Sequence, residues 1–161
     1  MLALLAAMLL MVATATSAQA HVVYERDEVW ANTDSTKCLY TYAEVSHGGR
    51  GGYVKSEGLS SSGIPAAQAC ILVWNRPAGY LATGYRYWKW NGSQWTVCRE
   101  YMSGIYNTTT TSRVTGSYNF GVVPPCGGGY YATTGYSGVL YGGQWLGKNV
   151  GVWSGQHFIE P

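Results

Sequence analysis

Short runs in which hydrophobic and polar residues alternate recur along the chain after residue 20, and they predict β-strands. The run 38–45 (CLYTYAEV) is one of them, because it alternates and is rich in strand-favouring residues. The more charged residues 21–37 are typical of a solvated entry segment or an edge strand. Glycine and serine gather at 47–52 and 57–63, where they predict a turn and a loop.

Two segments, 79–101 and 129–153, carry a hairpin signal. In the first, Asn91-Gly92 separates two strand-like runs, and both residue types tolerate the positive φ of a tight turn. Gly142-Gly143 stands at the corresponding place in the second.

The two hairpin segments also resemble each other in sequence. With an offset of 50 residues, positions 79–95 match positions 129–145 at seven of seventeen places, and Trp95 and Trp145 form one matching pair. Self-similarity at a constant offset predicts a duplicated hairpin unit.

These patterns predict the fold class. Residues 65–72 (PAAQACIL) alone resemble a helix, one or two turns long, with Pro65 suited to its first position. The rest consists of short strands and glycine-rich turns. We therefore predict one all-β domain over 21–161, a small disulfide-stapled sandwich or barrel of short antiparallel strands with a duplicated hairpin unit. The pattern leaves sandwich, barrel and Greek key open.

Residues 1–20 have the pattern of a secretory signal peptide. Residues 2–14 form an apolar run, and Ala18-Gln19-Ala20 is a small-x-small cleavage site, although no Lys or Arg precedes the run. A membrane anchor is the alternative, but about 13 apolar residues are short for crossing a bilayer. We therefore expect a secreted, extracellular protein without stable membrane insertion.

Four cysteines follow the apolar segment: Cys38, Cys70, Cys98 and Cys126. An even number in an exported chain is typical of two disulfides, and no C-x-x-C spacing suggests a zinc site. Three pairings are possible, and we favour Cys38–Cys70 with Cys98–Cys126 because neighbours in sequence pair most easily. On the chain-entropy account, each loop of about thirty residues would contribute about 3–4 kcal/mol.

Composition narrows the function classes. All 23 aromatic and all 18 charged residues follow residue 20, so the remainder is rich in aromatics and poor in charge. So many aromatics need burial, which argues against a disordered chain. The net charge of +2 lacks the basic excess of a duplex nucleic-acid binder, and three scattered cations, Arg86, Lys89 and Arg99, make a poor groove for a single strand. We expect no nucleic-acid partner.

Four motifs carry a resemblance to other proteins. They are WNRPAGY (74–80), KWNGSQWTVC (89–98), NFGVVPPCGGGYY (119–131) and VWSGQH (152–157). They resemble a group of small exported bacterial proteins, over most of residues 38–158. The resemblance implies secretion and two disulfides. Because that group has no established activity, it assigns no catalytic residue.

A hydrolytic site would need titratable groups held close together. Glu44 and His47 are near neighbours, with Ser46 between them, but SHGGRGG (46–52) is more simply a solvated turn. Residues 101–161 contain one acidic side chain, Glu160, so the aromatic region cannot supply a carboxylate pair by itself. No nucleophile-elbow, phosphate-loop or H-E-x-x-H motif occurs. We predict no catalytic residue.

A copper site is a distant third hypothesis. Cleavage after Ala20 would make His21 the first residue, and its amine and imidazole could then chelate Cu(II) with His47 or His157 as a second histidine. This arrangement resembles that of lytic polysaccharide monooxygenases, which are copper-dependent oxidative enzymes. Since it depends on one cleavage position, we predict no metal and no cofactor.

Aromatic side chains are the leading candidates for binding. In YRYWKW (85–90) a strand places Tyr85 and Tyr87 on one face and Trp88 and Trp90 on the other, so at least one aromatic face meets water. Rigid rings bind with little loss of entropy, and flat rings stack on the C–H faces of sugars. We predict that ligand is bound by Tyr85, Tyr87, Trp88, Trp90, Trp145 and Trp153. Core packing is the alternative for any single ring.

The leading hypothesis is a secreted, non-enzymatic module whose exposed aromatics bind cell-wall or other polysaccharide. The alternative partner is an extracellular protein, such as a peptidase inhibited by the loop Val122–Cys126, which two prolines pre-organise. That loop would otherwise serve only to link two halves of the chain. Asn91-Gly92-Ser93 and Asn107-Thr108-Thr109 fit the glycosylation sequence.

Overall fold

The computed structural model describes residues 22–30, 36–46, 51–61, 70–119, 121, 123–147 and 151–161. Within these ranges the chain forms strands and no helix, and every strand pairing is antiparallel. The strands are β1 (Val22–Trp30), β2 (Lys37–Ser46), β3 (Gly51–Ser61), β4 (Cys70–Val73), β5 (Leu81–Trp90), β6 (Trp95–Tyr106), β7 (Arg113–Asn119), β8 (Gly129–Tyr141), β9 (Gln144–Gly147), β10 (Val152–Trp153) and β11 (His157–Ile159). The all-β prediction is confirmed.

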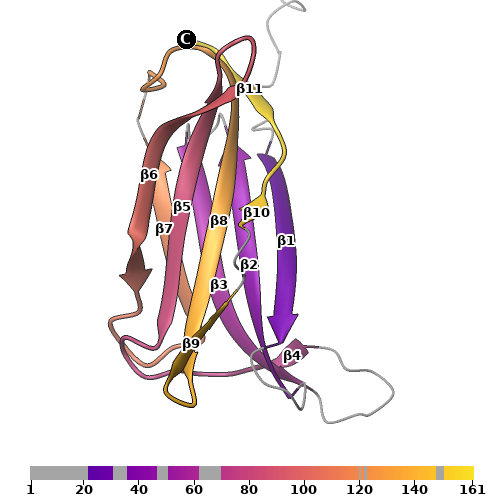
Figure 1. The fold of residues 1–161 in the computed structure, drawn as a ribbon, viewed down its shortest axis with the longest axis vertical. Helices are drawn as coiled ribbons and strands as arrows, with labels where there is room; N and C mark the ends of the chain where they lie inside the picture. Colours follow the sequence, from indigo (N-terminus) through magenta and orange to yellow (C-terminus); the bar gives the residue numbers. More distant parts are fainter. Residues whose placement is uncertain are drawn as a thin grey trace, which may run out of the picture.

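The strands form two sheets that pack face to face (Figure 1). The back sheet has the order β1-β2-β3, and both β4 and β7 pair with the far side of β3. The front sheet has the order β6-β5-β8, and β9, β10 and β11 each pair with the far side of β8. Of the architectures that the sequence left open, the fold is a sandwich. No helix of the described residues is long and apolar enough to cross a membrane.

Strand alternation decides which side chains fill the space between the sheets. The odd-numbered residues 81–87 of β5 and 131–139 of β8 are buried, and they meet the odd-numbered residues 39–45 of β2. Burial of their apolar surface at about 25 cal/mol per Å² is the main force that holds the layers together. The core residues include Leu39, Ala43, Val45, Val54, Leu81, Tyr85, Tyr87, Val114, Tyr131, Val139, Val152 and Ile159.

The two sheets approach each other closely beside Gly135 of β8. A Cβ atom at Gly135 would lie 2.9 Å from the carbonyl oxygen of Tyr42 and 3.1 Å from a methyl group of Val54. The first distance is shorter than real Cβ contacts and the second is tighter than most of them, so lack of space, rather than an unusual φ, favours glycine at this position.

Two disulfides, Cys38–Cys70 and Cys98–Cys126, confirm the predicted pairing. The first joins β2 to β4 within the back sheet. The second joins β6 to the turn that precedes β8. Two disulfides indicate an oxidising environment, as outside the cell.

The structure corrects two local predictions. The expected loop at 57–63 is wrong for residues 57–61, which continue β3, and the expected helix at 65–72 is wrong for residues 70–72, which belong to β4. In both places β3 pairs with β4, and this tertiary pairing overrides a weak local preference. Residues 65–69 lie outside the described residues.

The other local predictions agree with the structure where it describes them. The run 38–45 lies within β2. Within 21–37, residues 22–30 form β1 at an edge of the back sheet. The predicted signal peptide (1–20), His21 and the turn residues 47–50 lie outside the described residues.

Both predicted hairpins are present. β5 and β6 are joined by the four residues Asn91–Gln94, and the Asn91 side-chain oxygen accepts hydrogen bonds from the backbone N–H groups of Ser93 (3.0 Å) and Gln94 (2.9 Å). β8 and β9 are joined by Gly142-Gly143, whose φ angles of 58° and 79° are those of a type I′ turn.

Asn107 fixes the end of the sandwich where β6 stops. Its side chain is buried; Oδ1 accepts from the N–H of Leu81 (2.8 Å), and Nδ2 donates to the carbonyls of Pro77 and Thr109 (2.8 Å each) and Arg76 (3.3 Å). The amide nitrogen that a glycan would modify therefore serves the fold.

Candidate functional site: an aromatic face

The front sheet presents an aromatic surface on its outer side. The odd-numbered residues of β5 and β8 point into the core, so alternation directs the even-numbered residues away from the back sheet. Neighbouring strands place further rings on the same side, because residues paired across antiparallel strands share a face. We call this outer side the aromatic face. Its rings are Trp88, Trp90, Trp95, Tyr106, Tyr130, Tyr136, Trp145, Trp153 and Phe158.

Four tryptophans form one continuous group on this face, the upper tryptophan group: Trp88, Trp90, Trp95 and Trp153. The centroids of Trp95 and Trp153 are 5.1 Å apart at an interplanar angle of 77°. Trp90 lies 5.5 Å from Trp95, and Trp88 lies 6.3 Å from Trp153. Aromatic pairs at such distances stabilise one another, and two of these three are edge to face, so the indoles are held in place before any ligand arrives.

Trp88 is anchored within the group by its polar atom. Its indole Nε1–H donates to the hydroxyl oxygen of Thr134 on β8, at 2.7 Å. Arg86 lies 6.0 Å from the Trp88 ring and forms an ion pair with Glu100 of β6, at 2.8 Å. The ring is thus held by one hydrogen bond and lies near the Arg86–Glu100 ion pair.

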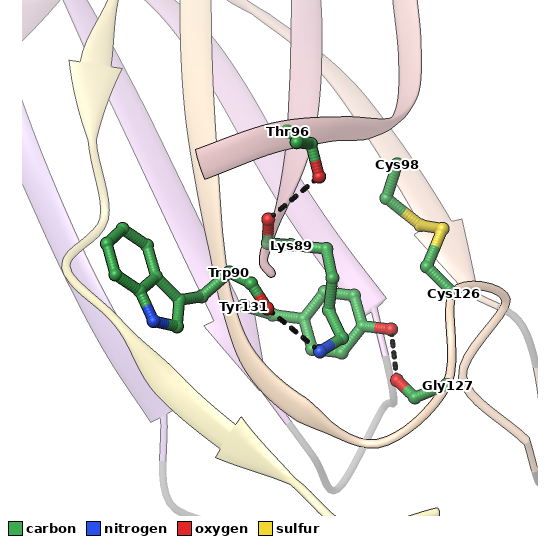
Figure 2. The surroundings of a disulfide bond; sticks show 7 residues. All are labelled: Lys89, Trp90, Thr96, Cys98, Cys126, Gly127 and Tyr131. Atoms are coloured by element: carbon green, nitrogen blue, oxygen red, sulfur yellow. Dashed lines mark hydrogen bonds between the residues drawn. A yellow bond between two sulfur atoms is a disulfide. The ribbon is translucent and has the colours of Figure 1, made fainter. Parts of the chain in front are cut away.

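The hairpin that carries Trp90 and Trp95 is fastened from the other side of the sheet (Figure 2). Lys89 lies with its ammonium group 5.5 Å from the centre of the Tyr131 ring and donates to the carbonyl of Trp90, at 3.1 Å. Thr96 donates to the carbonyl of Lys89, also at 3.1 Å. These contacts fix the backbone from which the two indoles project.

The Cys98–Cys126 disulfide secures the same end of the front sheet. It connects β6 to the turn before β8, and the hydroxyl of Tyr131 donates to the carbonyl of Gly127 in that turn (Figure 2). Together, these bonds connect β6 and β8 at this end without a strand pairing between them.

A second aromatic pair lies near the opposite end of the face, where the β8–β9 turn is located (Figure 1). This lower aromatic pair consists of Tyr106 and Trp145, whose centroids are 5.7 Å apart, and each side chain is 48% exposed. Gly138 leaves room for the indole, since a Cβ there would lie 3.3 Å from the Trp145 ring.

A shallow depression of about 190 Å³ lies between the upper and lower rings. Small residues, including Ala82, Gly84 and Gly138, line it, and the rings of Tyr106 and Tyr136 border it. The face therefore has rings towards both ends and a shallow depression between them.

The structure divides the predicted binding residues into two sets. Trp88, Trp90, Trp145 and Trp153 lie on the aromatic face, although Trp145 lies apart from the other three. For Tyr85 and Tyr87 the prediction is wrong, because both side chains are buried between the sheets.

The burial of Tyr87 excludes direct contact with a ligand. Its ring stacks on that of Tyr131, with centroids 4.9 Å apart, and burial raises the pKa of Tyr87 far above its usual value. The sequence showed that Tyr85 and Tyr87 share a face of the strand. It did not show that this face meets the back sheet, because both faces carry aromatics.

Sequence reasoning missed five rings of the face: Trp95, Tyr106, Tyr130, Tyr136 and Phe158. Trp95 carried a signal, because it matches Trp145 at the offset of 50 and directly follows the hairpin loop. Tyr130 and Phe158 pair across β8 and β11 with centroids 5.2 Å apart, and no local pattern connects two residues so distant in sequence.

The hydrolytic and copper hypotheses fall partly outside the described residues, since His21 and His47 are not among them. Glu44 accepts a hydrogen bond from the Tyr42 hydroxyl at 2.7 Å, and His157 is half-buried in β11. No group of three His, Cys, Asp or Glu side chains that could hold a metal occurs in the part of the chain that the structure describes.

Charge is concentrated on the opposite side of the molecule. On the outer side of the back sheet, Glu57 forms ion pairs with Lys55 (3.0 Å) and Arg113 (2.7 Å). Burial alone would raise the pKa of Glu57, but hydrogen bonds and positive charge from Arg113 and Lys55 outweigh it and hold the pKa below its usual value.

Comparison with known proteins identifies no relative: no family model matches the chain, and no curated protein or solved structure matches it significantly. The functional argument therefore depends on the residues and the geometry described above.

Proposed function

We propose that this protein is a secreted, non-enzymatic binding module whose aromatic face binds cell-wall or other polysaccharide. The observation that carries the proposal is the upper tryptophan group, in which four indoles contact one another on the outside of a rigid sheet. Trp153 is 37% exposed there, although tryptophan is a residue that folding normally buries.

The chemistry of the face suits a sugar. Fixed aromatic rings offer a large contact area and lose little entropy when a ligand binds, because they are already held by one another. The C–H faces of pyranose rings are flat and apolar, whereas their hydroxyls need polar partners. The exposed amide of Gln94, in the loop beside Trp95, can supply hydrogen bonds.

The predicted hairpin duplication supports the same proposal. Tyr85 of β5 pairs with Gly135 of β8, and these residues are 50 positions apart, the offset of the sequence repeat. If every residue of β5 is replaced by its counterpart 50 positions later in β8, and every residue of β8 by its counterpart in β5, the same residues still pair. A local two-fold axis that passes between Tyr85 and Gly135 would relate the two hairpins and bring Trp95 onto Trp145. These two matching tryptophans would thus lie towards opposite ends of the face.

Secretion belongs to the proposal as well. Its supports are the two disulfides, which persist in oxidising compartments, and the signal-peptide pattern of residues 1–20. A polysaccharide outside the cell would be accessible to such a protein.

A depletion assay tests the proposed function. The oxidised protein is mixed with insoluble chitin, cellulose, xylan or bacterial cell wall, and the unbound protein is measured. We expect saturable loss on at least one matrix, and a loss of affinity of about tenfold in Trp153→Ala, as for other central aromatic anchors. Tyr101→Ala is the matched control, because Tyr101 is an exposed ring on β6 that pairs with inward-facing Tyr85. Absence of binding to every matrix would refute the proposal.

Inhibition of an extracellular peptidase is the second candidate, and one observation favours it. Val123 is 64% exposed, beside buried Pro124, and the disulfide at Cys126 holds the end of the loop. An exposed side chain on a constrained loop is suited to a peptidase cleft. Inhibition that is lost in Val123→Asp but retained in Trp153→Ala would support this alternative over polysaccharide binding.

A further inference from the structure

We infer, given the proposed function, that the ligand is an uncharged and extended polysaccharide that lies along β5 and β8 and contacts both the upper tryptophan group and the lower aromatic pair. The inference adds the charge class and the length of the ligand to the proposal. It rests on three observations: the charges on the face, the spacing of its rings, and the floor between them.

Among the described strand residues of the front sheet, the charges on this face form a neutral pair. Along β5, β6 and β8, alternation places the charged side chains Arg86 and Glu100 on this side, and they pair with each other at 2.8 Å. Lys89 instead lies over Tyr131, and Arg99 lies 5.8 Å from the Tyr118 ring of β7. An anionic chain would approach Glu100 and would compete with its carboxylate for Arg86. A neutral chain meets no such cost.

The spacing of the rings sets a length. Trp153 pairs with Thr134, and Trp145 pairs with Leu140, further along the same strand β8. At about 3.3 Å per residue, these two positions are about 20 Å apart along the strand. A mono- or disaccharide reaches only one group of rings, whereas a longer chain contacts both, and two contacts on one rigid surface multiply the affinity.

The floor between the rings permits a continuous chain. The depression is lined by small residues of β5 and β8, including Ala82, Gly84 and Gly138, and by residues 102–104 of β6. Tyr136 borders the depression and provides an intermediate ring. A chain that bridges the two groups therefore remains in contact with the protein along its length.

Calorimetric titration with soluble oligosaccharides tests the inference. Neutral cello-, xylo- and chito-oligosaccharides of increasing length are compared with oligogalacturonates of matched length. We expect affinity for the neutral ligand to rise with length until the chain spans about 20 Å and then to level off. The anionic series should bind about tenfold more weakly or not at all.

The matched variants are Trp145→Ala and Trp153→Ala. Trp145→Ala should weaken long chains and leave short ones unchanged, whereas Trp153→Ala should weaken both. Equal affinity for short and long chains, or tighter binding of oligogalacturonates, overturns this inference while polysaccharide binding itself stands. No binding to any oligosaccharide or insoluble matrix overturns the proposed function instead. Concentration-dependent dimerisation that Trp153→Ala abolishes would assign the face to a second copy of the chain and overturn both.

Discussion

Trp95 and Trp153 meet edge to face, with centroids 5.1 Å apart, although they lie on β6 and β10, at opposite sides of the front sheet. The two side chains reach each other across the outer side of β5 and β8. The upper tryptophan group therefore forms only when the strands assemble into the sheet, because no single strand carries both residues. This contact connects the two edges of the aromatic face.

The first prediction concerns the bond that orients Trp88. Thr134→Val keeps the shape of residue 134 but removes the acceptor of the indole hydrogen bond. We expect about 1 kcal/mol lower stability and weaker polysaccharide binding, because the ring is no longer fixed. Denaturant unfolding and the depletion assay measure the two effects. Thr134→Ser retains a hydroxyl and should restore binding; if it does not, the hydrogen bond is not the cause.

The second prediction concerns Asn107 and the lower end of the sandwich. Asn107→Asp replaces an amide that donates to three carbonyls with a carboxylate that can only accept. We expect a loss of about 3 kcal/mol or more in the free energy of unfolding. Asn91→Asp is the control. Asn91 is exposed, and its side-chain oxygen only accepts hydrogen bonds, three in all, which a carboxylate oxygen can also accept. A comparable loss in both variants would contradict this role of Asn107.

The third prediction concerns the Cys98–Cys126 disulfide. Replacement of both cysteines by serine should lower stability by about 3 kcal/mol on the chain-entropy account. It should also weaken polysaccharide binding, because this bond secures the end of the sheet that carries Trp90 and Trp95. The corresponding replacement of Cys38 and Cys70 should lower stability and leave affinity of the folded protein unchanged. If both double replacements weakened binding equally, the Cys98–Cys126 disulfide would have no special role in holding the end of the sheet that carries Trp90 and Trp95.

The fourth prediction concerns the acid sensitivity of the back sheet. The pKa of Glu57 is lower in the folded protein than in the unfolded chain, because Arg113 and Lys55 stabilise the carboxylate. Its stabilising contribution is therefore complete above the usual carboxyl pKa and is lost as the pH falls through the lowered value. Thermal unfolding at a series of acidic pH values should show a smaller loss of stability in Glu57→Gln. An unchanged pH profile would contradict this assignment.

The sequence predicted those parts of the fold that depend on local pattern. Alternation identified β2, the turn residues identified both hairpins, and proximity in sequence identified the disulfide pairs. The sequence missed β4, because Cys70 and its neighbours become a strand only by pairing with β3. It also misplaced the end of β3, whose glycine and serine residues are held in the sheet by β2.

The aromatic face was predicted to a similar degree. Alternation separated Trp88 and Trp90 from Tyr85 and Tyr87, but both sets are aromatic, so hydrophobicity could not indicate the buried side. That choice is made by the back sheet, where Val45 packs against Tyr87 and Val54 packs near Tyr85. The contact of Trp153 with Trp95 depends on the order of the strands in the sheet, which no local pattern encodes.

The most direct test of the account is a tryptophan fluorescence titration with the polysaccharide that depletes the protein from solution. A ligand that covers the upper tryptophan group excludes water from its indoles, so we predict a blue shift of the emission that saturates with binding. The shift should be retained in Tyr101→Ala and lost in the double variant Trp95→Ala/Trp153→Ala. Binding without any change in emission, or undiminished binding by the folded double variant, would place the ligand elsewhere and contradict the account.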